Sequence, residues 1–331
     1  MVRVLSFLRG EGSDPFPNLA LEEALLGRVE PGECVLYLWQ NQRTVVIGRN
    51  QNPWKECRVR LLEEDGGRLA RRLSGGGAVF HDLDNLNFTF LLRREDYDVP
   101  RQTRVILRAM ELLGLRPQAT GRNDVTIQGR KFSGNAYYRG GEACYHHGTL
   151  LLAADREAME RYLSVGREKL RSKGVDSVKS RVAGLREFLP GLTLPELEGA
   201  ILRAFGETYG GEPRPFDPAR LDREELSALT EKYASWEWRF GREIPFSDEA
   251  ALRFPWGEAR LQLQVEGGRV RAARFWSDGL DTGLFPRAEE ALLGRPFRLE
   301  ELAAALEALE GDSPLQCEML RDLPELLERL F

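Results

Sequence analysis

A run of three glycines, within the stretch RRLSGGGAVFHDLDNLNFTF (71–90), restricts the folding of this chain more than any other feature. Glycine loses more conformational entropy on folding than any other residue, so three of them inside ordered structure need a physical reason. One reason is a tight turn between two strands. The other is a bulky anionic ligand that lies directly on the backbone and accepts hydrogen bonds from its N–H groups. These twenty residues leave both interpretations open.

The residues around the glycines favour a strand and a nearby cation. Arg71 and Arg72 precede the run, and alternation along an extended chain predicts that one of them points toward the ligand side. An arginine fork matches a carboxylate or a phosphate. After the run, the apolar residues of NLNFTF (85–90) alternate with polar ones, as in a half-buried strand. The spacing fits neither Walker A nor a dinucleotide-binding fingerprint.

Strand-like and helix-like patterns intermix over the first 210 residues. CVLYLW (34–39) and TVVIG (44–48) are separated by a polar QNQR and predict a β-hairpin, while WKECRVRLLEEDG (54–66) predicts a helix. Residues 101–113 predict a further helix, and KFSGNAYY and CYHHGTLLLA predict a pair of strands. Antiparallel pairs mixed with helices indicate an α+β fold with mixed or antiparallel sheets.

The pattern changes after residue 210. GGEPRPFDPARLD (210–222), rich in glycine and proline, predicts the start of a linker that extends to about residue 245. Alternating residues around Gly267 and Gly268 then predict a hairpin, followed by short amphipathic helices at 298–309 and 314–329. We expect a large domain over 1–245, including the linker at about 210–245, and a small α/β domain over 246–331.

A second polar stretch, GRNDVTIQGRKFSGN (121–135), places a lysine inside a predicted strand. A polar turn at 122–124 precedes the strand, and strand periodicity predicts that Lys131, Ser133 and Asn135 share one face, with Phe132 on the other. A lysine between small polar residues suits a compact cation placed against developing negative charge. A lysine on an edge strand is the alternative.

Composition excludes several classes of protein. The 331 residues carry a net charge of −5, which argues against a broad nucleic-acid footprint. No apolar run is long enough to cross a membrane, and the N-terminal apolar stretch is too short for a signal peptide. Four scattered cysteines without a C-x-x-C pair argue against a disulfide framework or structural zinc. We expect a cytoplasmic protein without nucleic-acid or membrane partners.

Four stretches in one order carry a family resemblance. TVVIGRNQNPWKEC, RRLSGGGAVFHDLDNLNFTF, GRNDVTIQGRKFSGNAYY and HHGTLLL together resemble the bacterial lipoate–protein ligase A family of the biotin/lipoate protein ligase superfamily. The resemblance covers the first 210 or so residues and extends loosely through ASWEWRFG into the small domain. Asp84 stands where the family commonly has glycine, so we expect a local turn change with unchanged chemistry.

The resemblance implies a biotin/lipoate-ligase-like catalytic domain and a two-step reaction. ATP and lipoate first form lipoyl-AMP and pyrophosphate, and the lipoyl group then moves to a lysine of a lipoyl-carrier domain. The expected partners are the lipoyl domains of 2-oxoacid dehydrogenase acyltransferases and the glycine-cleavage carrier protein. Both steps are displacements between substrate atoms, so the enzyme positions reactants and stabilises charge.

The resemblance also assigns roles to residues. Lys131 matches the central catalytic residue, which contacts the carboxylate–phosphate junction in both half-reactions. The implied ATP-binding set is Arg72, Gly77, Ala78, Val79, Phe80 and Lys131. The implied lipoate- and adenylate-binding set is Lys131, Trp39, Arg72, Gly76, His81 and His147. Asp124 is a candidate Mg²⁺ ligand, with a turn-forming aspartate as the alternative.

Two other functions stay open. A cysteine-dependent octanoyl or lipoyl transferase would need no ATP, but its nucleophile precedes a GRK-like motif, and GRNDVTIQ contains no cysteine. Cys144 follows the motif and is interpreted as a small buried hydrophobe. A non-catalytic lipoate-binding protein is the second alternative. The small domain is expected to close over the adenylate site and shield it from water.

Overall fold

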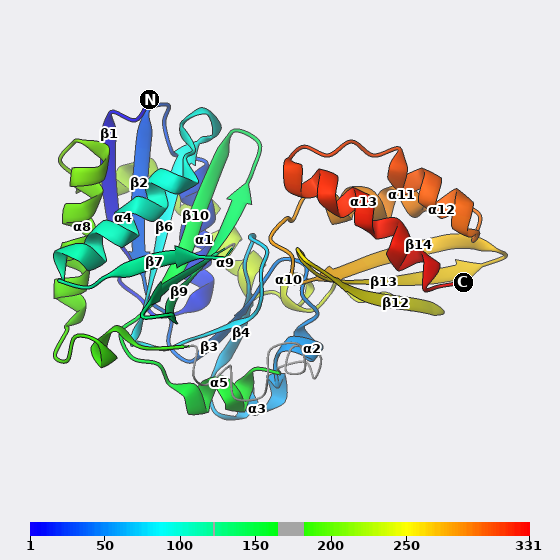
Figure 1. Ribbon diagram of the computed structural model, residues 1–331, viewed down its shortest axis with the longest axis horizontal. Coiled ribbons are helices and arrows are strands. Elements are labelled where there is room, and N and C mark those ends of the chain that lie inside the picture. The colour runs from blue at the N-terminus through cyan, green and yellow to red at the C-terminus, as the bar shows by residue number, and fades with distance from the viewer. Residues whose placement is uncertain (122, 165–181) are drawn as a thin grey trace. The chain divides into compact units, whose positions relative to one another are not determined.

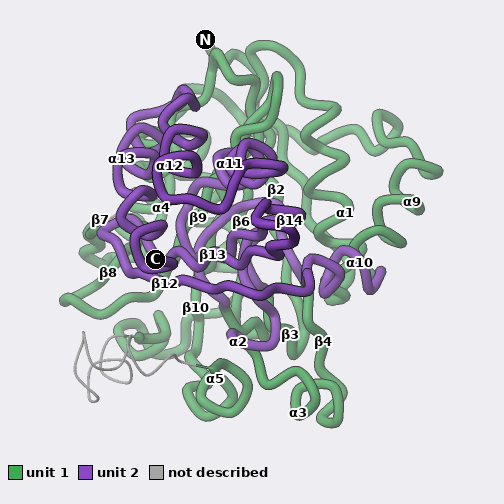
Figure 2. The backbone as a smooth tube through the Cα atoms, turned by 90° about the vertical axis from the view of Figure 1, so that its right-hand side faces the viewer, with its two compact units in different colours: residues 1–46, 57–70, 79–234 green, residues 47–56, 71–78, 235–331 purple. Residues whose placement is uncertain are grey.

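The computed structural model describes residues 1–121, 123–164 and 182–331 and shows a mixed α+β architecture (Figure 1). Arg122, in the polar turn expected from the sequence, lies outside the described residues. The chain forms two compact units, which Figure 2 distinguishes by colour. Unit 1 comprises residues 1–46, 57–70 and 79–234, and unit 2 comprises residues 47–56, 71–78 and 235–331.

The described strands fall into three sheets. Their bounds are β1 (Val4–Arg9), β2 (Glu33–Trp39), β3 (Thr44–Ile47), β4 (Arg68–Arg71), β5 (Val79–His81), β6 (Asn85–Arg93), β7 (Pro117–Thr120), β8 (Asp124–Ile127), β9 (Arg130–Arg139), β10 (Ala143–Leu151), β11 (Arg214–Pro215), β12 (Asp248–Phe254), β13 (Gly257–Glu266) and β14 (Arg269–Ser277).

The described helices are mostly short. Their bounds are α1 (Pro15–Leu26), α2 (Pro53–Glu56), α3 (Val59–Glu64), α4 (Val99–Leu112), α5 (Arg156–Tyr162), α8 (Leu194–Tyr209), α9 (Arg223–Ala234), α10 (Trp236–Arg239), α11 (Leu284–Leu292), α12 (Leu299–Glu307) and α13 (Pro314–Glu328), with single 3₁₀ turns at Arg94–Asp96, Leu185–Glu187 and Pro218–Arg220.

Unit 1 is organised around an eight-stranded sheet of order β11-β1-β2-β6-β10-β9-β8-β7. The pairs β11–β1 and β1–β2 are parallel, and the remaining pairs are antiparallel. The sheet is therefore mixed, and the predicted α+β class is confirmed. A second sheet of order β4-β3-β5 contains only short strands.

The hairpin predicted from residues 34–48 is wrong. β2 pairs with β1 and β6 in the large sheet, whereas β3 pairs with β4 and β5 in the small one. Between them, Asn41 is fully buried and Arg43 has a φ of 42°, so the chain leaves one sheet and enters the other. A polar turn in a sequence looks the same whether the chain returns along its own strand or moves to another sheet.

The other local predictions fared better. The hairpin of β13 and β14, the pair of β9 and β10, and the helix now labelled α4 are confirmed. The helix expected over 54–66 is two helices, α2 and α3, with Cys57 between them in an isolated bridge to Leu163. A long-range backbone pairing therefore interrupts a segment whose local pattern suits one continuous helix.

Helices cover both faces of the large sheet. Apolar side chains of α4 and α8 share one core with Leu36, Phe88 and Phe90 of the strands. On the opposite face, α1 lies against β6 and β10 and packs with α9 (Figure 1). Because neither face is open to solvent, adjacent residues on a central strand are both buried.

Unit 2 has its own core. The sheet β12-β13-β14 packs against α11, α12 and α13, with Phe275 and Phe285 among the fully buried side chains. The short segments 47–56 and 71–78 belong to this unit although they lie early in the chain. Residues 210–234 of the expected linker lie in unit 1, where β11 pairs with β1, and residues 235–245 lie in unit 2. No helix in the described part of the chain is long and apolar enough to span a membrane.

Candidate active site

Lys131 is placed by a tight hairpin between β8 and β9. Gln128 and Gly129 have φ values of 53° and 75°, as a two-residue hairpin turn requires. Lys131 follows this turn, and its Nζ lies 2.6 Å from Oδ1 of Asp124. The two side chains keep 35% and 40% of their exposure, so the ion pair is accessible to a substrate.

A register shift decides which way Lys131 faces. Thr126 pairs with Lys131, but Val125 pairs with Ser133, so one extra residue of β9 bulges between them. Paired residues share a face, so Lys131 lies on the face of Asp124 and Gly134, and Ser133 lies on the opposite, buried one. The predicted common face for Lys131, Ser133 and Asn135 is therefore wrong, because the bulge breaks the alternation.

Gly134 gives the lysine its space. A Cβ at Gly134 would lie 2.9 Å from Nζ of Lys131 and 3.0 Å from its Cε. The lysine side chain therefore extends across the backbone of Gly134, and any larger residue there would displace the ammonium group.

A buried polar network occupies the face of the large sheet that α1 covers. Glu22 of α1 accepts hydrogen bonds from Oγ1 of Thr89 at 2.7 Å and pairs with Nδ1 of His147 at 2.8 Å. The indole Nε1 of Trp39 donates to the same Thr89 hydroxyl at 3.1 Å. The ring of His81 meets that of Trp39 edge-on, with centroids 6.3 Å apart. The structure thus brings together Trp39, His81 and His147, three of the predicted site residues.

Glu22 was not predicted from the sequence. It is almost fully buried and joins His147 to Thr89. The sequence held one signal for it. In LALEEALL, helical spacing places Glu22 on the side that also carries leucines, and a helix seldom buries a carboxylate without partners.

The strand after the glycines separates two predicted residues onto opposite sides. His81 bonds through Nδ1 to the amide of Asn41 at 3.2 Å. Its neighbour Phe80 instead packs against Tyr162, with ring centroids 5.4 Å apart, beside a cavity of about 250 Å³. Asp82 lines this cavity, and burial raises the pKa of its carboxyl. Val79 and Phe80 lie in unit 1, whereas Gly76, Gly77 and Ala78 lie in unit 2.

Arg72 folds back over the glycine loop of unit 2. Its guanidinium donates to Oγ of Ser74 at 3.0 Å and to the carbonyl oxygens of Gly75 and Gly77 at 2.7 and 2.8 Å. The arginine is buried. These bonds hold the loop carbonyls on the arginine side and fix the path of the backbone.

The three glycines are needed for different reasons. A Cβ at Gly75 would lie 2.4 Å from the carbonyl oxygen of Gly279, so the two backbones touch there. Gly76 has a φ of 89°, and its N–H donates to the same Gly279 oxygen at 2.9 Å. A Cβ at Gly77 would have no atom of the described chain within 4 Å, and its φ is not in the left-handed region. Packing and strain thus account for Gly75 and Gly76 but not for Gly77.

Arg71 has a structural role that alternation alone did not reveal. Its guanidinium is fully buried and donates to five backbone carbonyls, those of Gly48, Arg49, Gln51, Trp238 and Arg239, at 2.6–3.2 Å. Burial lowers its pKa well below the ordinary arginine value. Arg71 therefore fastens segments 47–56 and 235–240 of unit 2 to each other.

Asp84, which departs from the family pattern, is held by local bonds. Its carboxylate pairs with Arg186 at 2.7 Å, and its N–H donates to the Asp82 side chain at 2.9 Å. Among the described non-glycine residues, only Arg43 and Gln128 have positive φ, so Asp84 does not adopt the left-handed conformation that glycine would allow.

The cysteines of unit 1 are unsuited to nucleophilic chemistry. Cys34, Cys57 and Cys144 are buried, and burial raises the pKa of each thiol. Over residues 1–121, 123–164 and 182–331, no three His, Cys, Asp or Glu side chains gather as a metal-binding group. Among these described residues, Asp124 is therefore not part of such a group.

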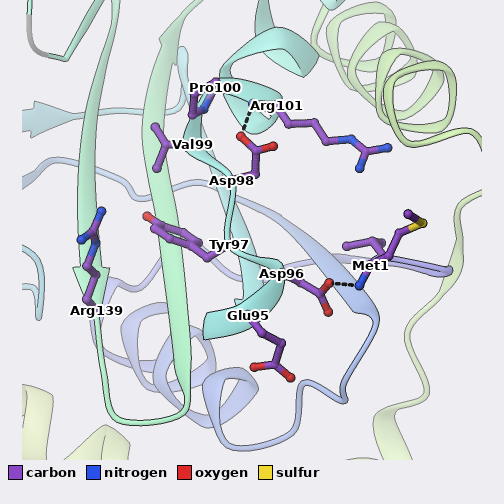
Figure 3. Close-up of a pocket in the computed structure, with 10 residues that line it drawn as sticks. Met1, Glu95, Asp96, Tyr97, Asp98, Val99, Pro100, Arg101 and Arg139 are labelled. Atoms are coloured by element: carbon purple, nitrogen blue, oxygen red, sulfur yellow. Dashed lines mark hydrogen bonds and ion pairs between the residues drawn. The ribbon is translucent and has the colours of Figure 1, made fainter.

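A larger cavity of about 520 Å³ is lined by none of the predicted site residues (Figure 3). Arg139, at the end of β9 opposite Lys131, lines it together with Asp96 and Asp98. Asp96 pairs with the amino group of Met1 and accepts from the N–H of Gly32, and Asp98 caps α4. Asp96 and Asp98 thus serve the local structure.

Two family models match this chain. A family model described as the lipoyl protein ligase A/B catalytic domain matches residues 14–206, and one described as the bacterial lipoate protein ligase C-terminus matches residues 243–327. The structure of P. falciparum LipL1 in complex with lipoate is 25% identical with a TM-score of 0.84, and the match covers 97% of this chain and 98% of that one.

Two further solved structures match part of this chain. An archaeal bi-partite lipoate protein ligase from Thermoplasma acidophilum, described with its E2 lipoyl domain, is 27% identical with a TM-score of 0.63, over 74% of this chain and 99% of that one. A lipoate-protein ligase A bound with ATP is 24% identical with a TM-score of 0.61, over 73% and 99%, and this likeness concerns the fold.

Proposed function

This chain belongs to the lipoyl protein ligase A/B catalytic domain family, and we propose that it is an ATP-dependent lipoate–protein ligase. The observation that carries the proposal is Lys131, a half-exposed ammonium group that lies across Gly134 and beside Asp124. A fixed cation of this kind stabilises negative charge that develops when an acyl phosphate bond forms or breaks.

The reaction needs no protein nucleophile. In the first step a carboxylate oxygen of lipoate attacks the α-phosphorus of ATP, and pyrophosphate leaves with the electrons of the broken P–O bond. In the second step the neutral amine of an acceptor lysine attacks the lipoyl carbonyl, loses a proton to solvent, and AMP leaves. Lys131 is proposed to contact the carboxylate–phosphate junction in both steps, where charge accumulates on oxygen.

We assign the nucleotide to the glycine loop and the strand after it. The proposed contacts are Arg72, Gly77, Ala78, Val79, Phe80 and Lys131. Gly77 supports this assignment, because neither packing nor backbone conformation in the described chain explains its missing side chain. A glycine of this kind lets a ligand lie against the backbone.

Asp124 is proposed as the protein ligand of Mg²⁺. Magnesium typically takes one or two carboxylates, with phosphate oxygens and water as the other ligands, so a single aspartate beside the phosphates suits it. The bound ion would neutralise phosphate charge.

Lipoate is proposed to bind through Lys131, Arg72, Gly76, Trp39, His81 and His147. Its hydrocarbon tail suits an apolar site with a cationic end. The P. falciparum relative was determined in complex with lipoate, which supports lipoate as the acid.

The proposed acceptors are lipoyl domains. The Thermoplasma ligase is described with an E2 lipoyl domain, which supports acyltransferase lipoyl domains of 2-oxoacid dehydrogenases. We extend the proposal to the glycine-cleavage carrier protein, and we infer a cytoplasmic location. We also propose a catalytic domain over 1–245 and an accessory domain over 246–331 that shields the adenylate from water.

A cysteine-dependent transferase is the alternative, and the thiols speak against it. Cys144 is buried among core residues and its pKa is raised by burial, so it is a protonated thiol and a poor nucleophile.

Lys131→Ala tests the proposal, with Lys232→Ala as a matched control. Lys232 is also a partly buried lysine, paired with Glu23 at 2.6 Å. We expect lipoate-dependent pyrophosphate release by Lys131→Ala to fall about 100- to 1000-fold, with an unchanged unfolding midpoint, while Lys232→Ala stays active. Mass spectrometry of an added lipoyl domain follows the transfer. Near-normal turnover by Lys131→Ala, or transfer from an acyl thioester without ATP, would contradict the proposal.

A further inference from the structure

His146 is buried on the face of the large sheet opposite to the network of Glu22 and His147. It lies on β10, where it pairs in register with Phe90 of β6 and Tyr137 of β9. Its ring is enclosed by Phe88, Phe90 and Tyr137, with centroids 4.9–6.1 Å away. His146 and the adjacent His147 are both buried, because helices cover both faces of the sheet.

One hydrogen bond fixes the chemical state of this histidine. Nε2 of His146 lies 2.8 Å from Oδ1 of Asn135. The other amide atom of Asn135, Nδ2, donates to the carbonyl oxygen of Asn123 at 3.1 Å, which establishes the orientation of the amide. Oδ1 can only accept, so Nε2 carries the hydrogen. Nδ1 has no partner in the described chain, and burial lowers the pKa of the ring to about 3, so His146 is neutral.

Asn135 ties this histidine to the turn that carries Asp124. Besides the bond from Nδ2, the backbone N–H of Asn135 donates to the Asn123 carbonyl at 2.8 Å. In return Nδ2 of Asn123 donates to the Asn135 carbonyl at 2.9 Å. Three bonds therefore hold Asn123, and the next residue is Asp124, which pairs with Lys131.

Gly148 leaves the space that this path needs. A Cβ at Gly148 would lie 2.8 Å from Oδ1 of Asn135 and 2.6 Å from the ring of Phe88. The glycine of HHGTLLL thus admits the asparagine of GRKFSGN, which in turn holds the asparagine of GRND. One hydrogen-bond path connects three separate stretches of sequence.

We propose that His146 is a positioning residue, which acts through Asn135 and Asn123 to set the place of Asp124 and hence of the Lys131 ammonium group. This inference rests on the proposed role of Lys131 and adds a residue that does not touch the substrates. A rigid, neutral donor enclosed by aromatic rings leaves the asparagine amide a single orientation. The fixed amide of Asn135 in turn fixes the position of the turn that carries Asp124. Small displacements of a catalytic group lower the reaction rate, so the position of this turn matters for catalysis.

His146→Phe and His146→Gln test the proposal in the full-length chain. Phenylalanine keeps an aromatic ring but removes the donor, whereas glutamine keeps an N–H donor. We expect His146→Phe to lower kcat for lipoate-dependent pyrophosphate release by about 10- to 100-fold, with KM for ATP and lipoate within about threefold. His146→Gln should recover most of the rate. The control is Gln102→Met, which removes another buried polar side chain, without partners in the described chain, from α4.

A double mutant separates positioning from general damage. In a Lys131→Ala background, His146→Phe should lower the residual rate by less than about twofold, because the group it positions is gone. The same loss in both backgrounds, or a normal kcat for His146→Phe, would overturn the inference. A fully active Lys131→Ala would instead overturn the proposed function itself. If His146→Phe does not fold, Asn123→Ala breaks the same path at its more exposed end and should give the same loss of kcat.

Discussion

Gly75 and Gly77, two residues apart, should respond in opposite ways to the same substitution. Alanine at Gly75 would place Cβ 2.4 Å from the Gly279 oxygen and 2.6 Å from the Leu280 oxygen. Both contacts are backbone atoms, which cannot rotate away as a flexible side chain can. Alanine at Gly77 would meet no atom of the described chain within 4 Å. The pair therefore separates a packing role from a ligand role inside one loop.

The expected magnitudes follow from these distances. A Cβ at Gly75 is about 1 Å inside ordinary van der Waals contact, so the backbone must shift, and overpacking of this kind costs about 1–3 kcal/mol of stability. Gly77→Ala should leave stability unchanged or raise it by about 0.4–1 kcal/mol, since alanine restricts the unfolded chain. If the nucleotide lies on this backbone, losing one hydrogen bond to a charged group costs about 1.5–3 kcal/mol. That loss corresponds to an increase of about 10- to 100-fold in KM for ATP.

Two measurements check this. Thermal and urea unfolding of both variants report stability, and lipoate-dependent pyrophosphate release at varied ATP concentration reports KM. The expected result is an unstable Gly75→Ala, and a stable Gly77→Ala that binds ATP poorly. A Gly77→Ala variant with the wild-type KM for ATP would refute the argument that a ligand explains this glycine. A Gly75→Ala variant as stable as the wild type would refute the packing argument.

Three other substitutions have defined outcomes. Burial lowers the pKa of folded His146 to about 3, so between about pH 6.5 and pH 3 the unfolded chain binds a proton that the folded chain does not. Stability therefore falls as pH drops below about 6.5, by roughly 1 kcal/mol from this residue at pH 5.5. Urea unfolding at pH 7.5 and 5.5 should show a smaller difference for His146→Gln. Arg71→Met leaves buried carbonyls without donors and should lower stability by about 3 kcal/mol or more, measured by thermal unfolding; an unchanged midpoint would contradict its structural role. Cys144→Ala should keep lipoate-dependent pyrophosphate release within about twofold of wild type, whereas complete loss in a folded variant would favour the thiol transferase.

The fold was predictable wherever the deciding interactions are local. Gly267 and Gly268 have φ values of 58° and 70°, and their backbone freedom suffices to predict the hairpin of β13 and β14. The polar residues at 40–43 contain no such information about a partner strand, and the hairpin predicted there does not exist. Turn residues indicate that a chain bends. Which strand then pairs with which depends on the whole sheet.

The candidate site divides in the same way. The resemblance proposed Lys131, Arg72 and the glycine loop as site residues, and these roles stay predictions. The partners of each side chain came only from the structure. The bulge in β9 places Lys131 on the face of Asp124 and opposite to Ser133. The periodicity of GRKFSGN does not indicate this bulge. The buried Glu22 was missed because its partners lie on strands far along the chain.

The sequence by itself determined the α+β class, many of the helices and strands, and the presence of a glycine-rich loop before a strand. Tertiary structure alone decided that Arg71 is bound by five carbonyls, and that His146 reaches the turn before Asp124. The physical reason is range. Backbone preferences and turn chemistry act over a few residues, whereas the carbonyl of Trp238 that Arg71 bonds lies 167 residues away in the chain. Such partners are set by sheet register and by the crossing of distant segments, so they exist only once the chain has folded.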